Sequence, residues 1–422
     1  MCADFDPSRP HGHVSWRLHE GLPVVEVVNN WVCESFAETY RPPLVGNHIG
    51  HVLRALHPDV LHIHNLLNLT FDLPAMARCL GIRVVATLHD YTLVCASGGQ
   101  RVHRAEHHRC DVIETSRCAR CFCESPFYTQ IAYSKVSAAA PGIVYRAARQ
   151  VAHAFPEIAA RLAGATRRAT GLSVTAADLD ARLAAAREVF DQVDLFVAPS
   201  SSLASQYCSL GIPSTKIRVS DYGFVPLATP PRERNGRRLR IGYVGTLVWH
   251  KGVHVLIDAV RNLPADRYEL KIFGDPRVFP DYAADLRARA SRLPVHFMNA
   301  FTRDQTPEIY QQIDVLAVPS LWLENSPLVI HEAYMAGVPV VGSRIGGIAD
   351  LVADGRNGCL YEPTSAQALT AALLTLIEHP DRLNEFRQCL PPVKTIEEDA
   401  REWEAAYRGL VDDSRQNAAG RF

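Results

Sequence analysis

The stretch from Pro319 to Gly347, PSLWLENSPLVIHEAYMAGVPVVGSRIGG, most constrains how this chain can fold. The residues just before it, 314–318 (DVLAV), form a short apolar run that indicates a buried strand. After a loop, Ser326 can cap a helix, and Pro327 suits the first helical position, where a missing N–H costs nothing. A glycine and a proline then end the helix, and residues 338–341 start another strand. The pattern predicts a strand, a loop, a helix and a second strand.

Glu324 and Glu332 lie eight positions apart across the start of this helix. Glu324 falls in the loop and Glu332 about a turn and a half inside the helix, so both can face a ligand over its N-terminus. The free N–H groups between them suit a diphosphate, and the carboxylates suit hydroxyls on either side of it. The alternative is that both are solvated helix charges. Their place at the carboxyl end of a buried strand, where open α/β sheets bind ligands, favours the ligand interpretation.

The composition is that of an ordinary globular protein and excludes several classes. The 422 residues allow two domains, with 47% hydrophobic and 21% charged residues. A formal charge of −1 gives no reason to expect nucleic acid as a partner. No apolar run is long enough to cross a bilayer, and MCADFDPSRPHGH lacks the apolar core of a signal peptide, so we expect a cytoplasmic protein. The 11 cysteines suit thiols and a metal better than a secreted disulfide framework.

Strands alternate with helices in the first half of the chain, which predicts a parallel sheet. The expected strands are 23–28, 59–63 and 83–88, and the helices between them are 45–55 and 73–80. Two strand ends carry histidines, in LHIHN (61–65) and TLHDY (87–91). We interpret His62 and His64 as packed, hydrogen-bonded residues.

A long polar loop, 91–125, then carries a cluster of cysteines. Four of them could surround a tetrahedral Zn²⁺, with the last two in a tight hairpin: Cys95, Cys110, Cys118 and Cys121. Such a loop has little to hold it together without a metal, so we predict a structural zinc site with no open catalytic position. The alternatives are unbound thiols, or ligation through Cys123, His103, His107 or His108.

Residues 130–190 are rich in Ala, Arg and Leu at helical spacing and end in an amphipathic helix over 177–190. Five arginines of this segment, at 146, 149, 161, 167 and 168, could contact anionic lipid headgroups at a membrane surface. We prefer the alternative, in which they lie on the solvent-exposed face of a helix. A polar linker, 229–239, separates an N-terminal domain (1–228) from a C-terminal domain (240–394). The last segment, 395–422, should contain a terminal helix and a loose tail from Asp412.

Three stretches of the second half together resemble retaining glycosyltransferases of the two-domain GT-B architecture, specifically glycosyltransferase family 4. They are IGYVGTLVWHKGVHVLIDA (241–259), the E-x7-E segment of Glu324 and Glu332, and GVPVVGSRIGGIADLVADGRNGCLYEP (337–363). The resemblance implies an α/β fold of two Rossmann-like domains whose parallel sheets face a cleft, with a terminal helix that crosses back to the first domain. It also implies that the first domain lacks its opening strand and glycine-rich turn, through a late start or a lost interior strand.

The resemblance further implies a role for each motif residue. Glu324 would orient hydroxyls of the donor sugar, Glu332 the ribose and Lys251 the diphosphate, while His89 would reach the sugar from the other domain. The remaining donor contacts would come from Gly245, Thr246, Phe301, Asn325, Ser326, Leu328 and Val329. Many relatives have an arginine where Thr246 stands, so this chain offers one fewer fixed positive charge. The pair Gly346-Gly347 would let a ligand approach, or would only turn the chain.

These roles predict transfer of a sugar from a nucleotide-diphosphate sugar, with retention at the anomeric carbon, in polysaccharide or glycoconjugate biosynthesis. The acceptor would be a glycan, a lipid-linked molecule or a small molecule, and the enzyme would work in the cytoplasm or at the inner face of the membrane. No catalytic metal is expected, because the lysine and the helix dipole stabilise the leaving diphosphate. The alternatives are a GT-B nucleotide-sugar epimerase and a non-catalytic nucleotide-sugar-binding or scaffold protein.

Overall fold

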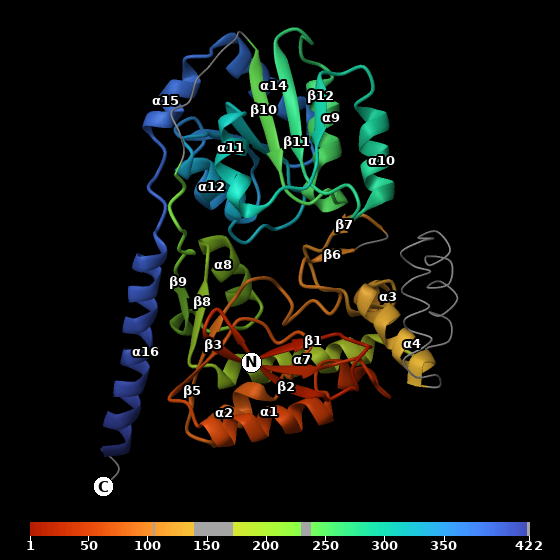
Figure 1. The fold of residues 1–422 in the computed structure, drawn as a ribbon, viewed down its shortest axis with the longest axis vertical. Coiled ribbons are helices and arrows are strands. Elements are labelled where there is room, and N and C mark those ends of the chain that lie inside the picture. The colour runs from red at the N-terminus through yellow and green to blue at the C-terminus, as the bar shows by residue number, and fades with distance from the viewer. Residues whose placement is uncertain (104–105, 139–171, 229–237, 420–422) are drawn as a thin grey trace. The chain divides into compact units, whose positions relative to one another are not determined.

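The computed structural model describes residues 1–103, 106–138, 172–228 and 238–419 (Figure 1). The chain divides into two compact units. The first comprises Met1–Val197, Tyr207–Arg218 and the residues from Ala406, and the second comprises Ala198–Gln206 and Val219–Ala405. The five arginines of the Ala- and Arg-rich segment, and nearly all of the expected linker, lie outside the described residues.

The main sheet of the first unit follows the expected alternation of strands and helices from 59 onward, but the expectation that the strand at 23–28 joins it is wrong, because that strand pairs in a separate sheet. Its strand order is β4 (Val60–Ile63), β5 (Arg83–Thr87), β8 (Leu195–Ala198), β9 (Ile217–Val219), and β4, β5 and β8 run parallel. The helices of this unit are α1 (Pro43–Leu56), α2 (Leu73–Cys79) and α7 (Ala176–Gln192), while α8 (Ser201–Ser209) follows β8 and belongs mostly to the second unit. A capping box at Thr175 and Asp178 begins α7, in which each residue bonds the other's backbone N–H. Asp194 ties β8 to β5 by accepting from the backbone N–H of Val84 at 2.8 Å.

A separate three-stranded sheet precedes the main one, in the order β1 (Cys2–Asp4), β3 (Leu22–Val28), β2 (Val14–His19). Cross-strand pairs such as Trp16 with Val25 give it an apolar face. In the described residues, β1 and β4 are edge strands of two different sheets. A groove with a cavity volume of about 480 Å³ lies between residues of β1, α1 and β4. No described strand joins β1 and β4 into one sheet.

The cysteine-bearing segment contains more regular structure than the expected loop. It forms β6 (Val102–His103), β7 (His108–Arg109), α3 (Thr115–Cys123) and α4 (Pro126–Ala138). The prediction of a tight hairpin at Cys118 and Cys121 is wrong, because both residues lie on α3. Their i, i+3 spacing places the two thiols on one face of that helix.

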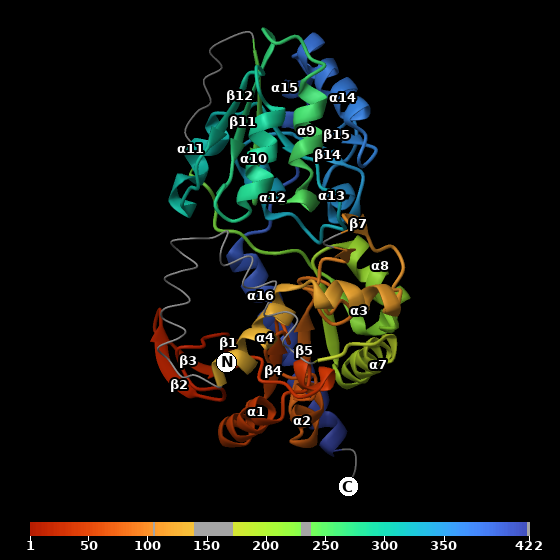
Figure 2. The same cartoon turned by 90° about the vertical axis from the view of Figure 1, so that its right-hand side faces the viewer.

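The second unit is built on a six-stranded sheet in which every described pair runs parallel. Its order is β12 (Val295–Met298), β11 (Tyr268–Phe273), β10 (Leu239–Val244), β13 (Val315–Val318), β14 (Val340–Ser343), β15 (Gly358–Tyr361). Side chains alternate between two apolar layers. One layer involves α9 (Val253–Val260), α10 (Pro280–Arg289), α14 (Ala366–Glu378) and α15 (Arg382–Gln388), and the other α11 (Thr306–Gln311), α12 (Leu328–Met335) and α13 (Gly346–Leu351) (Figure 2).

The last helix, α16, runs from Ile396 to Ala419. Its residues up to Ala405 belong to the second unit and those from Ala406 to the first. The expectation of a loose tail from Asp412 is wrong, because the helix continues past that residue. Among the described residues, no helix combines the length and the hydrophobicity that a bilayer-spanning segment needs.

Candidate active site

The candidate site lies where the strand order of the second unit reverses. From β10 the chain proceeds outward through β11 and β12, and it then returns to place β13 on the other side of β10. Open α/β sheets bind ligands at such a switch point, outside the carboxyl ends of the two central strands. The loop after β10 carries Gly245, Thr246 and Lys251, and the loop after β13 carries Glu324. Residues 70 positions apart in the chain thus meet at one edge.

Close backbone contacts hold these two loops together. The N–H of Leu321 donates to the carbonyl of His250 at 2.8 Å. Gly252 has a φ of +71°, and a Cβ there would lie only 1.8 Å from the carbonyl oxygen of Pro319. Only glycine fits this position, because any side chain would collide with fixed backbone. The turn that presents Lys251 is therefore built onto the end of β13.

The partly exposed Lys251 and the buried Glu324 form an ion pair between the loops. The Nζ of Lys251 lies 2.7 Å from Oε1 of Glu324, and Ser320 donates its hydroxyl to the same oxygen at 2.5 Å. Glu324 is only 5% exposed, and the ammonium of Lys251 lies 5.1 Å from the ring centroid of Trp322. Both contacts fall on Oε1 of the carboxylate. The pair fixes the carboxylate while keeping a cation beside it.

The backbone of Glu324 is held from behind by the turn at Gly346-Gly347. The N–H of Gly347 donates to the carbonyl of Glu324 at 2.7 Å. A Cβ on Gly346 would lie 2.5 Å from that carbonyl, and one on Gly347 would lie 1.9 Å from the carbonyl of Asn325. Of the two expected reasons for these glycines, the structure supports a turn that admits the neighbouring loop.

The N-terminus of α12 differs from the expectation in one detail. The helix begins at Leu328, its N-cap position is Pro327, and no side chain caps it. Ser326 is therefore not the cap, because its hydroxyl contacts Asp221 and His331. The first N–H groups of α12, on Leu328 and Val329, are thus available to an anion at the positive end of the helix dipole. Leu328 is 50% exposed there, whereas the neighbouring Asn325 and Ser326 are buried.

Glu332 faces a different part of the site. Its Oε2 accepts a hydrogen bond from the hydroxyl of Tyr310 at 3.0 Å, and the same hydroxyl lies 3.0 Å from the carbonyl of Val329. Burial raises the pKa of Glu332, although the Tyr310 hydrogen bond and the positive charge of Arg303 oppose the rise. Phe301, from the loop after β12, is half-buried and packs on the apolar layer under α12.

The loop after β10 turns sharply at its first residue. Gly245 has a φ of +151°, and its N–H donates to the carbonyl of Phe273 at 3.0 Å. The carbonyl of Thr246 accepts from the hydroxyl of Tyr243 at 2.8 Å and from the N–H of Val248 at 3.0 Å. These bonds hold the turn that leads to Lys251.

His89 belongs to the first unit, at the carboxyl end of β5. Its Nε2 lies 2.9 Å from Nδ1 of His64, and the ring of His62 packs on His64 with centroids 4.1 Å apart. His62 also contacts the hydroxyls of Thr87 and Tyr407 at 2.8 and 2.6 Å. Burial, together with a smaller effect of the neighbouring histidines, lowers the pKa of both His62 and His89 to about 4, so both rings are neutral at pH 7.

The four predicted zinc ligands gather in the first unit around α3. Burial, together with a smaller effect of neighbouring thiols that include Cys95 and Cys121, raises the pKa of Cys110 to about 11 and that of Cys118 to about 12. Such mutual effects require the sulfur atoms to be near one another. Among the described residues, no three His, Cys, Asp or Glu side chains are already arranged around a common metal position. An all-thiol set is the donor chemistry that Zn²⁺ prefers in closed sites.

Sequence reasoning missed several residues at these sites. Ser320 and Tyr310 hold the two glutamates. No sequence signal pointed to Tyr310, because its contact with Glu332 spans 22 positions and two helices. The interpretation of His62 and His64 as packed, hydrogen-bonded residues is confirmed, since their rings pack together and His64 contacts His89.

Comparison with known proteins agrees with this geometry. The family described as Glycosyl transferases group 1 matches residues 238–379, which contain the whole switch point. Those residues are similar to the domain that defines this glycosyltransferase family. D-inositol 3-phosphate glycosyltransferase of Corynebacterium urealyticum is 36% identical over 152 residues, which are 34% of this chain and 35% of that protein. The chain thus matches only part of the length of such relatives.

Solved structures extend the likeness to the fold of nearly the whole chain. Sucrose-phosphate synthase from Thermosynechococcus elongatus has a TM-score of 0.58 at 16% identity, covering 97% of this chain and 87% of that one. Anabaena Alr3699/HepE in complex with UDP-glucose has a TM-score of 0.53 at 17% identity, covering 90% and 82%. The prediction of a GT-B fold with two Rossmann-like units is confirmed, and the residues that match the group 1 family lie in its second unit.

Proposed function

We propose that this protein is a retaining glycosyltransferase that moves a sugar from a nucleoside-diphosphate sugar to an acceptor hydroxyl. The observation that carries the proposal is the Lys251–Glu324–Ser320 arrangement beside the uncapped start of α12. It combines a cation and helix N–H groups, which suit a diphosphate, with a fixed carboxylate, which suits sugar hydroxyls. The match of the surrounding residues to the group 1 family supports the same donor class.

In the proposed reaction the bond between the anomeric carbon and the diphosphate breaks, and a bond from the acceptor oxygen forms on the same face. The acceptor proton passes to the departing diphosphate. Lys251 and the α12 N-terminus stabilise the negative charge that grows on the leaving group. Glu324 orients the donor sugar, and Glu332 orients the ribose. No catalytic metal is needed.

The acceptor is proposed only as a class: a glycan, a lipid-linked molecule or a small molecule with a free hydroxyl. The donor base is also open, and the HepE complex makes UDP-glucose the first compound to try. A thermal-shift screen of UDP, GDP, ADP and their glucose conjugates should find one that stabilises the protein. At a ligand concentration 100 times Kd the stabilisation is about 2.7 kcal/mol.

The deciding variant is Glu324→Gln, which preserves shape and removes the charge. We expect it to retain the fold and nucleotide binding and to lose transfer of the sugar by about 100-fold or more, the scale of a lost transition-state contact. Unchanged turnover with the true donor would reject the role of Glu324. Binding without turnover in the wild-type protein would instead indicate a non-catalytic nucleotide-sugar-binding protein, and an altered donor without an acceptor would indicate an epimerase.

We also propose that Cys95, Cys110, Cys118 and Cys121 bind one structural Zn²⁺. The proximity of the four thiols supports this, because a dication would offset the repulsion that opposes their ionisation. Purified protein should then contain about one zinc per chain, and a chelator should make four more thiols reactive. Cys118→Ser should lose the metal, whereas Cys208→Ser, on α8, should keep it. A zinc content near zero after growth in zinc-supplemented medium would reject the site.

A further inference from the structure

The buried hydroxyl of Ser326 joins the donor loop to a carboxylate far away in the sequence. Its Oγ lies 2.8 Å from Oδ1 of Asp221 and 2.9 Å from Nε2 of His331, and the same Nε2 lies 3.2 Å from Oδ2 of Asp221. Ser326 and His331 are both less than a tenth exposed. Burial works against the charge on Asp221, but the hydrogen bonds from His331 and Ser326 outweigh it and lower the pKa of that carboxyl.

The proton positions in this cluster follow from its geometry. A serine has one hydroxyl proton, and the carboxylate of Asp221 can only accept it. The oxygen of Ser326 must then accept from His331, so Nε2 of that histidine carries a proton. This differs from a serine hydrolase, in which the acidic residue bonds the ring nitrogen opposite the serine. The cluster is therefore suited to holding Ser326 in place and not to making it a nucleophile.

The segment that contains Asp221 continues this contact to the start of the last helix. The ring of Phe224 stacks on His331 with centroids 4.7 Å apart. The N–H of Phe224 donates to the carbonyl of Lys394 at 2.9 Å, and the N–H of Ile396 donates back to Phe224 at 2.9 Å. A Cβ on Gly223 would lie 2.5 Å from that of Asp399, so the two segments touch without room for a side chain.

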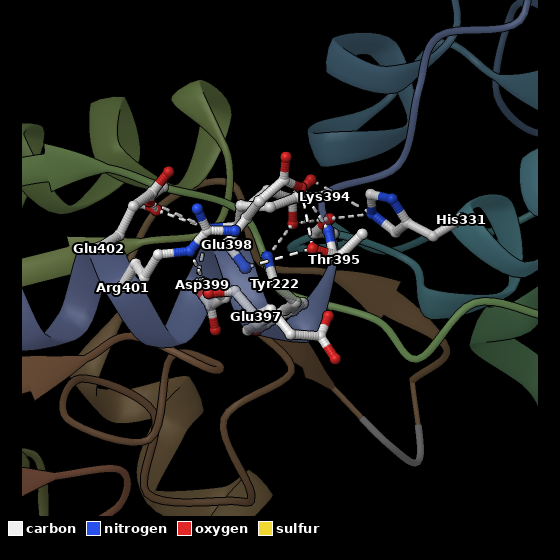
Figure 3. A network of polar contacts seen from close by, with 12 residues as sticks. Tyr222, His331, Lys394, Thr395, Glu397, Glu398, Asp399, Arg401 and Glu402 are labelled. Carbon is white, nitrogen blue, oxygen red and sulfur yellow. Dashed lines mark hydrogen bonds and ion pairs between the residues drawn. The ribbon is translucent and has the colours of Figure 1, made fainter.

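Polar side chains reinforce the pairing of these segments (Figure 3). Lys394 contacts the hydroxyl of Ser220 at 2.9 Å, Asp399 at 2.7 Å and Glu402 at 3.2 Å. Ser220 also donates to Glu402 at 2.7 Å. All of these residues belong to the second unit, and the chain passes to the first unit just before Val219 and just after Ala405. The network therefore lies on the two stretches of the second unit that adjoin these passages, 219–224 and 394–402.

We propose that Asp221 and His331 are positioning residues that hold the donor loop through Ser326 and couple its occupancy to the connecting segments 219–224 and 394–402. The inference rests on the proposed function, because it assigns the ligand at the α12 N-terminus to a nucleoside diphosphate. His331 and Glu332 are consecutive in α12, so one residue faces the network while the next faces Tyr310. A ligand that orders this first turn also orders the residues that contact Asp221 and Phe224. By thermodynamic reciprocity, breaking the contact weakens ligand binding.

The test is hydrogen exchange of the full chain with and without UDP, or whichever of GDP and ADP binds instead. In the wild-type protein the nucleotide should slow exchange at α12 and also in 219–224 and 394–402. Ser326→Ala and His331→Leu should keep some protection at α12, lose it in the connecting segments, and weaken nucleotide binding about tenfold. His331→Gln retains an N–H near the position of Nε2 and should restore much of the coupling. His296→Leu, on an exposed face of β12, is the matched control and should behave as wild type.

Two results would overturn the inference while leaving the proposed function intact. One is a nucleotide that binds and protects α12 while exchange in 219–224 and 394–402 stays unchanged. The other is full coupling in Ser326→Ala, which tests the same contact if His331→Leu does not fold. Failure of every nucleoside diphosphate to bind the wild-type protein would instead refute the proposed function, and the inference with it.

Discussion

Replacing Lys251 by methionine removes the cation from a buried carboxylate and leaves the surrounding packing nearly intact. Glu324 is 5% exposed, and the side chain of Lys251 is 29% exposed. Loss of one partner of a fully buried pair costs about 3–5 kcal/mol, because the other charge stays behind without compensation. The partial exposure of the lysine and the remaining hydrogen bond from Ser320 reduce this, so we expect about 2–3 kcal/mol for Lys251→Met.

Glu324→Gln combined with Lys251→Met should be less destabilised than the two single variants would suggest if their effects added. The glutamine needs no counter-charge, so the double-mutant cycle should give a coupling of about 1–3 kcal/mol. The free energy of opening the second unit can be measured from native-state hydrogen exchange at the β10 and β13 amides. Arg277→Met is the control, since Arg277 is 82% exposed and pairs with Asp275 at the surface. Its replacement should change nothing measurable. Purely additive effects at Lys251 and Glu324, or a Lys251→Met variant as stable as Arg277→Met, would refute the reasoning.

Two further predictions use other features of the fold. Gly252→Ala places a Cβ 1.8 Å from the carbonyl of Pro319 and should lower the free energy of unfolding by about 3 kcal/mol or more. Gly355→Ala is the control, since Gly355 has a similar φ of +73° and nothing within 4 Å of the added Cβ, and it should lower that free energy by about 1 kcal/mol. Equal urea midpoints for the two variants would contradict this. The pKa values of His62 and His89 are near 4 in the folded protein and near 6.5 in the unfolded chain. Between these pH values only the unfolded chain binds the protons, so the stability of the first unit should fall as pH drops from 6.5 to 4. His89→Gln should reduce that pH dependence by about one proton, and identical slopes for variant and wild type would count against the burial of that ring.

Much of the architecture could be predicted from apolar runs and their punctuation. The strands at 22–28, 60–63 and 83–87 lie within a residue or two of the predicted positions, because each is a short apolar run with a turn at its end. The sequence also placed Glu324 after the buried strand at 314–318, where the structure has β13. Helix ends were harder, since α16 continues to Ala419 beyond the expected end.

The details of the site depended on contacts between distant parts of the chain. Ser326 has the residue type and spacing of a helix cap, but Asp221, 105 positions earlier, takes its hydroxyl. Gly346 and Gly347 suggested an approach by a ligand, whereas the close neighbour is the backbone of Glu324 and Asn325. The spacing of Cys118 and Cys121 fits a hairpin and one face of a helix equally well, and the local sequence did not decide between them.

The most direct test of the account is a crystal structure of the full chain with the nucleoside-diphosphate sugar that stabilises it best. The account predicts the diphosphate on the N–H groups of Leu328 and Val329 with Nζ of Lys251 beside it. It also predicts a sugar hydroxyl on Glu324 and the ribose on Glu332. A nucleotide bound away from the β10–β13 edge, or one whose phosphates touch neither Lys251 nor the start of α12, would contradict it.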